Sequence, residues 1–210
     1  MSDPREAILA HACDLYLAYG LDGFSMRKLA KEVGVTAPAL YRHYHGREAV
    51  LADVVRQAYR VFMSYVFHAL EAPTPLERFV RAGEGYLDFA LDHPRWYAIL
   101  FSGPERLGMA SLPADIEGMG SAIHQFWIDR VSECMRAGIL VEGDALKISL
   151  TLWAHAHGLV HLYQQGRLEC TKEEFRELFL ESGSRLLAGL ATPEHADAFS
   201  VRDTSTGEVP

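Results

Sequence analysis

The sequence has few cysteines, and they lie far apart. Cys13, Cys134 and Cys170 are the three thiols among 210 residues, and no two of them form a CxxC pair. An odd, scattered set argues against a disulfide framework and is typical of a reducing compartment. We therefore expect a cytoplasmic protein.

Long apolar runs are also missing. The most apolar stretch, ISLTLWAHAHGLVHLY at 148–163, contains three histidines and is too short to cross a bilayer comfortably. The chain does not open with the basic, apolar and small-residue series of a secretory signal. From these absences we expect a protein that is neither inserted into a membrane nor secreted.

Signals for β-hairpins, such as Asn-Gly between alternating strands, are absent, whereas helix start and stop signals recur. Ser25, Thr36 and Asp144 can cap helices, and Thr171 with Glu174 forms a capping box. The sequence predicts an all-α fold, with helices at about 4–19, 26–33, a short segment after 36, 47–70, 76–92, 114–137, 145–165 and 172–189. The polar segment TPEHADAFSVRDTSTGEVP, residues 192–210, lacks sustained periodicity and is predicted to be a disordered tail.

The net charge of −8 is unusual for a nucleic-acid-binding protein, but the charge is unevenly distributed. Residues 1–60 contain eight Lys/Arg and seven Asp/Glu, whereas residues 61–210 contain twelve and twenty-one. An acidic body behind a near-neutral N-terminal region would turn that region toward a polyanion. Solubility alone is the other explanation for this charge.

The segment SMRKLAKEVGVTAPALYRHYHGREAVL, residues 25–51, predicts two helices joined by a sharp turn at Gly34. The second helix starts with small residues, Ala37, Pro38 and Ala39, which would let it enter a DNA major groove. The polar side chains on or near its outer side can donate hydrogen bonds to phosphates: Thr36, Tyr41, Arg42 and His43. Arg47 lies at the start of the next helix, where free backbone N–H groups also face anions. A plain helical hairpin with ordinary surface charge is the alternative.

The stretch GLDGFSMRKLAKEVGVTAPALYRHYHGREAVL resembles the N-terminal domain of the tetracycline-repressor (TetR) family of transcriptional regulators over about residues 5–55. The resemblance implies an all-helical homodimer with an N-terminal helix-turn-helix domain and a divergent C-terminal domain for effector binding and dimerisation. It also implies DNA-contacting roles at matching positions, with Thr36–Ala39 toward the bases and Arg47 on a phosphate. The predicted DNA-binding residues are Ser25, Arg27, Thr36, Ala37, Pro38, Ala39, Tyr41, Arg42, His43 and Arg47.

In the C-terminal half, LDHPRWYAILF and LWAHAHGLVHLY resemble a TetR-type effector domain whose penultimate long helix has a Trp and a His-Gly pair. An aromatic-rich set spread over several helices suits a flat or apolar ligand, although for each aromatic alone core packing is the better explanation. The predicted ligand-binding residues are Tyr86, Phe89, Trp96, Tyr97, Phe101, Phe126, Trp127, Trp153 and His157. Small residues near Gly158 and Gly183 would allow close helix pairing between subunits.

The histidines of HAHGLVH could instead hold a metal, because His157 and His161 are four residues apart on one helix face. His155 should point elsewhere, and that helix has no HExxH pattern and no carboxylate at ligand spacing. We expect no metal and no cofactor. The alternative is an all-helical metal-binding protein or enzyme that uses His155, His157 and His161; a helical adaptor that has lost DNA binding is a second one.

These patterns predict a helix-turn-helix domain at 1–47 and a helical-bundle effector and dimerisation domain at 48–191. The expected function is a ligand-responsive, non-enzymatic transcriptional repressor. Its partners would be a two-fold symmetric double-stranded DNA operator, a small hydrophobic or aromatic effector and a second copy of the chain, with no membrane.

Overall fold

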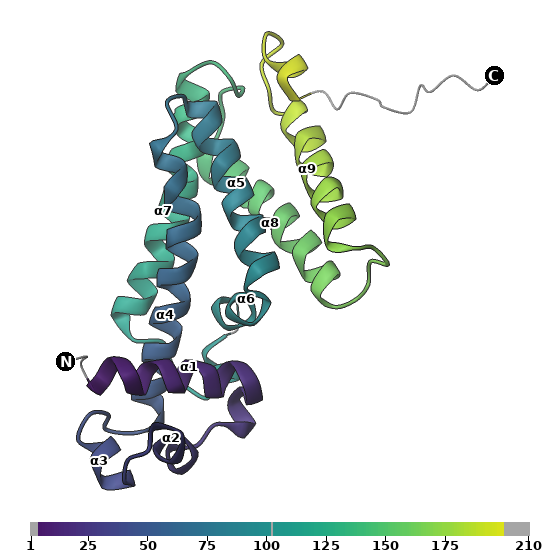
Figure 1. Ribbon diagram of the computed structural model, residues 1–210. Helices are drawn as coiled ribbons and strands as arrows, with labels where there is room; N and C mark the ends of the chain where they lie inside the picture. The colour runs from purple at the N-terminus through teal and green to yellow at the C-terminus, as the bar shows by residue number, and fades with distance from the viewer. Residues whose placement is uncertain (1–3, 102, 200–210) are drawn as a thin grey trace. The chain divides into compact units, whose positions relative to one another are not determined.

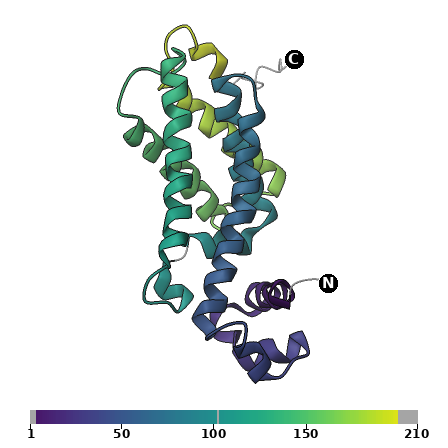
Figure 2. The ribbon, with the colours of Figure 1, turned by 90° about the vertical axis from the view of Figure 1, so that its left-hand side faces the viewer.

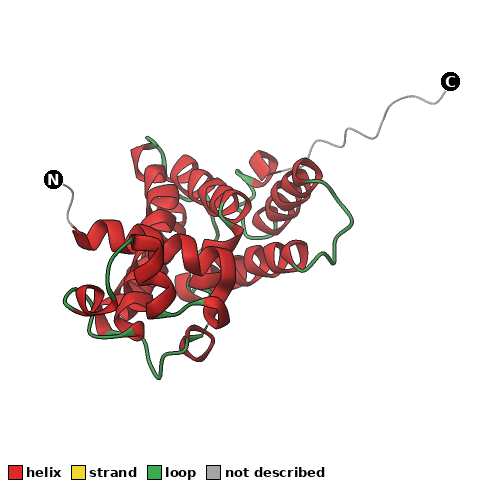
Figure 3. Cartoon of the chain, turned by 60° about the horizontal axis from the view of Figure 1, so that its bottom comes forward, coloured by secondary structure: helices red, strands yellow, loops and turns green. Residues whose placement is uncertain are grey.

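A computed structural model describes residues 4–101 and 103–199. Over these residues the chain forms nine α-helices and three short 3-10 helices, and no strand appears in the same ranges (Figure 3). The all-α prediction is therefore confirmed. Among the helices described, none combines the length and apolar character needed to cross a bilayer.

The helices form two compact units. The first contains the residues up to Ser64 together with Asp92–Ile123, and the second contains Tyr65–Leu91 together with the residues from His124 onward. Two helices, α4 (Arg47–Phe67) and α7 (Ala114–Arg136), contribute residues to both units. The units therefore divide the chain differently from the predicted boundary at residue 47, because segment 92–123 packs with the N-terminal helices.

The first unit begins with α1 (Pro4–Gly23), α2 (Met26–Val33) and α3 (Ala37–Tyr41). The predicted end of the first helix corresponds to a kink, because Gly20 adopts a φ of 65° inside α1. The unit also holds α6 (Pro94–Leu100), the 3-10 helix η2 (Pro104–Leu107) and the start of α7. Figure 2 shows the long helices α4 and α7 side by side.

The core of the first unit packs α1, α2, α3 and the first half of α4 around one apolar cluster. Its least exposed members, each at most 1% exposed, are Ala12, Leu29, Leu40, Tyr44, Val50, Leu51, Val54, Ala58 and Ile116. The three N-terminal helices therefore share one buried centre with α4 and the start of α7.

The second unit contains η1 (His68–Glu71), α5 (Pro75–Asp92), the second half of α7, α8 (Ala145–Gln164), α9 (Lys172–Ala188) and η3 (Ala196–Phe199). Helices α8 and α9 lie side by side (Figure 1). Asp144 caps α8, and the Thr171–Glu174 capping box opens α9, as the sequence predicts. On α5, Gly85 is required by close packing, since a Cβ there would lie 2.4 Å from the Tyr65 carbonyl oxygen.

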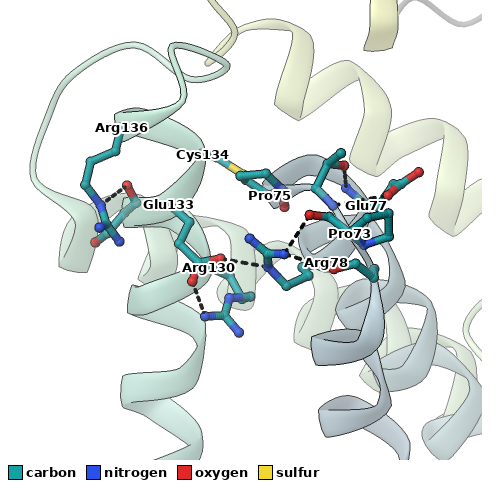
Figure 4. A network of polar contacts seen from close by, with 11 residues as sticks. Pro73, Pro75, Glu77, Arg78, Arg130, Glu133, Cys134 and Arg136 are labelled. Carbon is teal, nitrogen blue, oxygen red and sulfur yellow. Dashed lines mark hydrogen bonds and ion pairs between the residues drawn. The ribbon is translucent and has the colours of Figure 1, made fainter.

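Arg78 of α5 binds Glu133 of α7, and Arg130 of α7 binds the same carboxylate (Figure 4). The Nε of Arg78 lies 3.1 Å from Glu133, and Nη2 of Arg130 lies 2.6 Å from the other oxygen of the same carboxylate. Arg130 is only 6% exposed, and its Nε and Nη1 have no hydrogen-bond partner among the described residues. The shared carboxylate therefore fixes the two helices at this level of the unit.

Residues 192–199 do not behave as the predicted disordered tail. Thr192 donates its backbone N–H to the carbonyl of Ile139 at 3.0 Å, and Phe199 is 6% exposed in an apolar cluster with Phe79. The side chain of Phe199 packs this polar segment against the core. A single buried aromatic leaves no periodic pattern in the sequence, so the contact could not be predicted. The rest of the predicted tail, 200–210, lies outside the described residues.

Candidate functional sites

The helix-turn-helix is built by local capping. Ser25 Oγ accepts the N–H of Lys28 at 3.2 Å and starts α2, and Thr36 Oγ1 accepts the N–H of Ala39 at 3.3 Å and starts α3. Between them, Gly34 adopts a φ of 76°, and the Val35 N–H bonds to the Ala30 carbonyl at 2.9 Å. Glycine reaches this left-handed conformation without a steric cost, so the chain can turn sharply into α3.

The outer side of this motif presents the predicted DNA-binding residues. Leu40 and Tyr44 are buried, whereas Tyr41 between them is 49% exposed. Two of the predicted residues, Ala37 and Ala39, are half-buried. The others are exposed: Ser25, Arg27, Thr36, Pro38, Tyr41, Arg42, His43 and Arg47.

The arginines near the motif differ in their partners. Arg27 and Arg42 have exposed side chains with no hydrogen bond or ion pair to any described residue. Arg47 is engaged, since its Nη2 donates to the Leu21 carbonyl at 2.5 Å. That contact was not predicted from the sequence; the signal for it is Gly20, whose kink interrupts the hydrogen bonding of α1 beside Leu21.

Behind the motif, Asp53 of α4 gathers three donors. Arg5 Nη2 and the Tyr44 hydroxyl each lie 2.9 Å from Asp53 Oδ2, and Arg56 donates to Oδ1. Arg56 also donates from Nε to Asp115 of α7 at 2.5 Å. Asp53 lies on α4 and thus connects this helix to α1 and to the segment that follows α3. Arg56 extends the connection to α7.

The pKa values in this network follow from burial and hydrogen bonding. Burial alone would raise the pKa of Asp53, but hydrogen bonds from Arg5, Tyr44 and Arg56 lower it below its usual value. Burial, with the hydrogen bond to Asp53, raises the pKa of Tyr44 to about 12 despite the opposing effect of Arg5. Tyr44 therefore remains a donor and Asp53 a carboxylate at neutral pH.

The second unit contains a cavity of about 310 Å³ between α5, α7, α8 and α9. Its walls are mostly apolar, with a few polar groups among them. The apolar and glycine lining residues are Leu76, Phe79, Val80, Gly83, Trp127, Val131, Leu152, Trp153, Ala156, Phe179, Leu180, Gly183, Leu186, Leu187 and Phe199. The polar lining residues are Glu84, Tyr86, Ser149, His155 and Ser184. A cavity of this size and composition suits a small organic ligand.

Three of the predicted ligand-binding residues line this cavity: Tyr86, Trp127 and Trp153. His157 does not line it but bonds through Nδ1 to the Tyr86 hydroxyl at 3.3 Å. The ring of Trp127 meets the rings of Tyr86 and Phe126 edge-on, with centroids 6.5 and 5.5 Å away. Part of the cavity wall is thus formed by aromatic residues that were predicted to bind the ligand.

The other predicted aromatics pack elsewhere. Phe89 is fully buried against Tyr65, with ring centroids 5.8 Å apart. Trp96, Tyr97 and Phe101 belong to the first unit, where the rings of Tyr97 and Phe101 lie 4.5 Å apart. The sequence does not indicate which core a buried aromatic will join.

Two polar residues of the cavity were not among the predicted ligand-binding residues. His155 lines the cavity and bonds through Nε2 to the hydroxyl of Ser182 at 3.0 Å. Ser149 is 4% exposed, lines the cavity, and has no hydrogen-bond partner within the described ranges. The sequence signal for Ser149 was its position as a polar residue in the most apolar stretch of the chain.

The three histidines of α8 point to different neighbours. His155 bonds to Ser182, whereas His157 bonds to Tyr86 and stacks with His161 at 6.4 Å between ring centroids. Across residues 4–101 and 103–199, no group of three or more His, Cys, Asp or Glu side chains could hold a metal ion.

The fold and sites define an α-helical protein with a helix-turn-helix and a separate cavity for a small molecule. The family models agree. That of the bacterial regulatory proteins of the tetR family matches residues 8–54, and that of the tetracyclin repressor-like C-terminal domain matches residues 79–183. The chain therefore belongs to the TetR family of bacterial regulatory proteins.

Individual relatives show the same relationship. The tetracycline repressor protein class C of Escherichia coli is 40% identical over 54 residues, which are 26% of this chain and 24% of that protein. The chain matches between 23% and 49% of the length of such curated relatives. A Rhodococcus sp. RHA1 protein of unknown function has a similar structure, with a TM-score of 0.80, 26% identity, and 91% and 97% of the two chains covered. The regulator AibR, solved with isovaleryl coenzyme A and operator DNA, has a TM-score of 0.63 at 18% identity, covering 90% and 98% of the two chains, and shows the fold alone.

Proposed function

We propose that this chain is a homodimeric repressor that binds a two-fold symmetric DNA operator and releases it when a small apolar effector enters the cavity of the second unit. In this proposal, residues 1–47 bind DNA, and residues 48–191 bind the effector and pair the subunits. The protein is not an enzyme and acts in the cytoplasm, where its DNA is found.

The observation that most supports the DNA-binding site is the set of exposed, unengaged donors around α3. Arg42, Tyr41 and His43 project from the side opposite Leu40 and Tyr44, and Arg27 projects from α2. Exposed arginines without carboxylate partners are free to bind phosphates. Because Arg47 is bonded to Leu21, its primary role here is to hold α4 against the end of α1, and phosphate contact is its second role.

The dimer interface is expected on α8 and α9. Exposed apolar side chains recur along α8 at Leu146, Leu150 and Leu162, and Leu178 adds to them on α9. Gly158 on the same helix leaves open space where a partner helix could approach closely. Gly183, by contrast, lines the cavity, so we assign it to effector binding rather than to subunit pairing.

The effector would act through the helices that contribute to both units, α4 and α7. A ligand shifts an equilibrium only if it binds one state more tightly than the other. The effector must therefore favour a conformation of the second unit in which the two α3 helices of the dimer no longer match successive major grooves.

The test is a salt titration of DNA binding, with duplexes that the protein selects from a random pool. Each phosphate contact contributes about 0.9 to the slope of log affinity against log salt, and a symmetric dimer makes each contact twice. Arg42→Ala should reduce the slope by about 1.8, whereas the exposed Arg95→Ala, on α6, should leave it unchanged. Equal slopes for wild type and Arg42→Ala would contradict the proposed interface.

A further inference from the structure

The cavity of the second unit has one charged lining residue among the described residues, Glu84 of α5. Glu84 is exposed, and its carboxylate makes no hydrogen bond or ion pair within the described part of the chain. No Lys or Arg side chain of the described ranges lines the cavity. A ligand that enters therefore meets a negative charge without a compensating positive one.

Arginines of the surrounding helices are bound to other acceptors. Arg78 and Arg130 share Glu133 (Figure 4), and Arg78 Nη1 also donates to the Ala72 carbonyl at 2.9 Å. On α9, Arg176 Nη2 lies 2.5 Å from Asp88. Each of these side chains is paired with a carboxylate, and none of them lines the cavity.

The remaining polar groups of the wall are the hydroxyls of Tyr86, Ser149 and Ser184 and the imidazole of His155. The Ser149 hydroxyl has no hydrogen-bond partner in the described part of the chain, so it can donate to or accept from a ligand. His155 uses Nε2 with Ser182, which leaves Nδ1 for a second partner. The faces of Trp127, Trp153 and Phe79 add electron-rich surfaces that attract cations.

We infer that the effector is a cationic amphiphile: an apolar body with an amine or similar cationic group, whose charge is matched by Glu84. This inference rests on the proposed function, because it names the chemical class of the ligand of that same cavity. An amine would pair with Glu84, and its apolar body would cover the aromatic walls. A carboxylate or acyl phosphate of equal size would be repelled by Glu84 and would find no cation.

The test uses three probes that differ only in their terminal group: 4-(biphenyl-4-yl)butylamine, the matching butanol and the matching butanoic acid. Binding is followed by the fluorescence of Trp127 and Trp153, which line the cavity. At pH 7.4 the amine should bind about tenfold more tightly than the acid, with the alcohol between them.

Glu84→Gln should weaken amine binding about tenfold and leave the alcohol unchanged. The control, Glu177→Gln, removes an equal charge from an exposed site on α9 that does not line the cavity, and should change none of the three affinities. Binding of the acid as tight as that of the amine, or amine binding unaffected by Glu84→Gln, would overturn the inference. The proposed function would stand in that case, provided that a bound probe released DNA. If none of the probes bound, the proposed role of the cavity would fail, and the inference with it.

Discussion

The two units of this protein treat their polar groups in opposite ways. Behind the helix-turn-helix, Asp53 accepts from Arg5, Tyr44 and Arg56, and each of these donors is thereby engaged. In the cavity of the second unit, Ser149 and Glu84 have no partner among the described residues. Paired side chains hold neighbouring helices together, as in a scaffold, whereas polar wall groups without a protein partner are free to bind a ligand.

The same contrast appears within the first unit, between the arginines proposed to bind DNA and those that hold the helices together. Arg27 and Arg42 remain free around α3, whereas Arg5 and Arg56 nearby are paired with carboxylates. The scaffold thus fixes where the free donors lie. Four predictions sharpen or break this comparison, from the largest expected effect to the smallest.

Asp53→Ala should give the largest loss of stability. It leaves Arg5, Tyr44 and Arg56 without a shared acceptor, and breaking such a partly buried charged network costs about 2–4 kcal/mol. Asp115→Ala removes only the second partner of Arg56 at a 57% exposed side chain, where solvent screens the ion pair, and should cost much less. Urea unfolding of both variants measures the difference, and equal losses would show that Asp53 is not the centre of the scaffold.

Two glycines of α5 provide a matched pair in the second unit. Gly85→Ala would place a Cβ 2.4 Å from the Tyr65 carbonyl oxygen, and the resulting overpacking should cost about 1–3 kcal/mol. Gly83 lines the cavity with no atom within 4 Å of its would-be Cβ. Gly83→Ala should therefore stabilise α5 by up to about 1 kcal/mol. Thermal unfolding measures both shifts, and a loss at Gly83 as large as that at Gly85 would contradict the open cavity.

His157 should give a smaller, pH-dependent effect. Burial, and then the nearby His161, lower the pKa of His157 below its usual value of about 6.5. The unfolded chain then takes up the proton first, so the contribution of His157 to stability falls as the pH drops below about 6.5 and through the lowered pKa of the folded state. Unfolding curves at several pH values for wild type and His157→Gln should show a shallower loss in the variant, and identical pH profiles would exclude His157 as a source of acid sensitivity.

Much of the first unit could be predicted from the sequence because its signals are local. Ser25, Thr36 and Gly34 each define a helix end within three residues of themselves, and the structure confirms all three. The Asp53 network escaped prediction because its bonded partners are 3 to 59 residues apart along the chain and most of them meet only through the packing of separate helices.

The cavity was less predictable for the same reason. It needs α5, α7, α8 and α9 together, and a sequence does not show whether Trp96 or Trp127 will face it. The single anchor Phe199 also lies in a polar segment without periodicity. Aromatic content indicated a ligand-binding unit, but the choice among aromatics depended on tertiary packing.

The central claim is that occupation of this cavity controls DNA binding. A graded series at Gly183, which lines the cavity and has open space around its would-be Cβ, tests the claim: Gly183→Ala, Gly183→Leu and Gly183→Trp. The affinity of each variant for a selected duplex is measured with and without the tightest-binding of the three biphenyl probes. The account predicts that probe-induced release declines in order of side-chain volume, because a larger side chain leaves less room for the probe. If the Trp variant were released by the probe as readily as wild type, the effector would have to bind elsewhere and the account would be wrong.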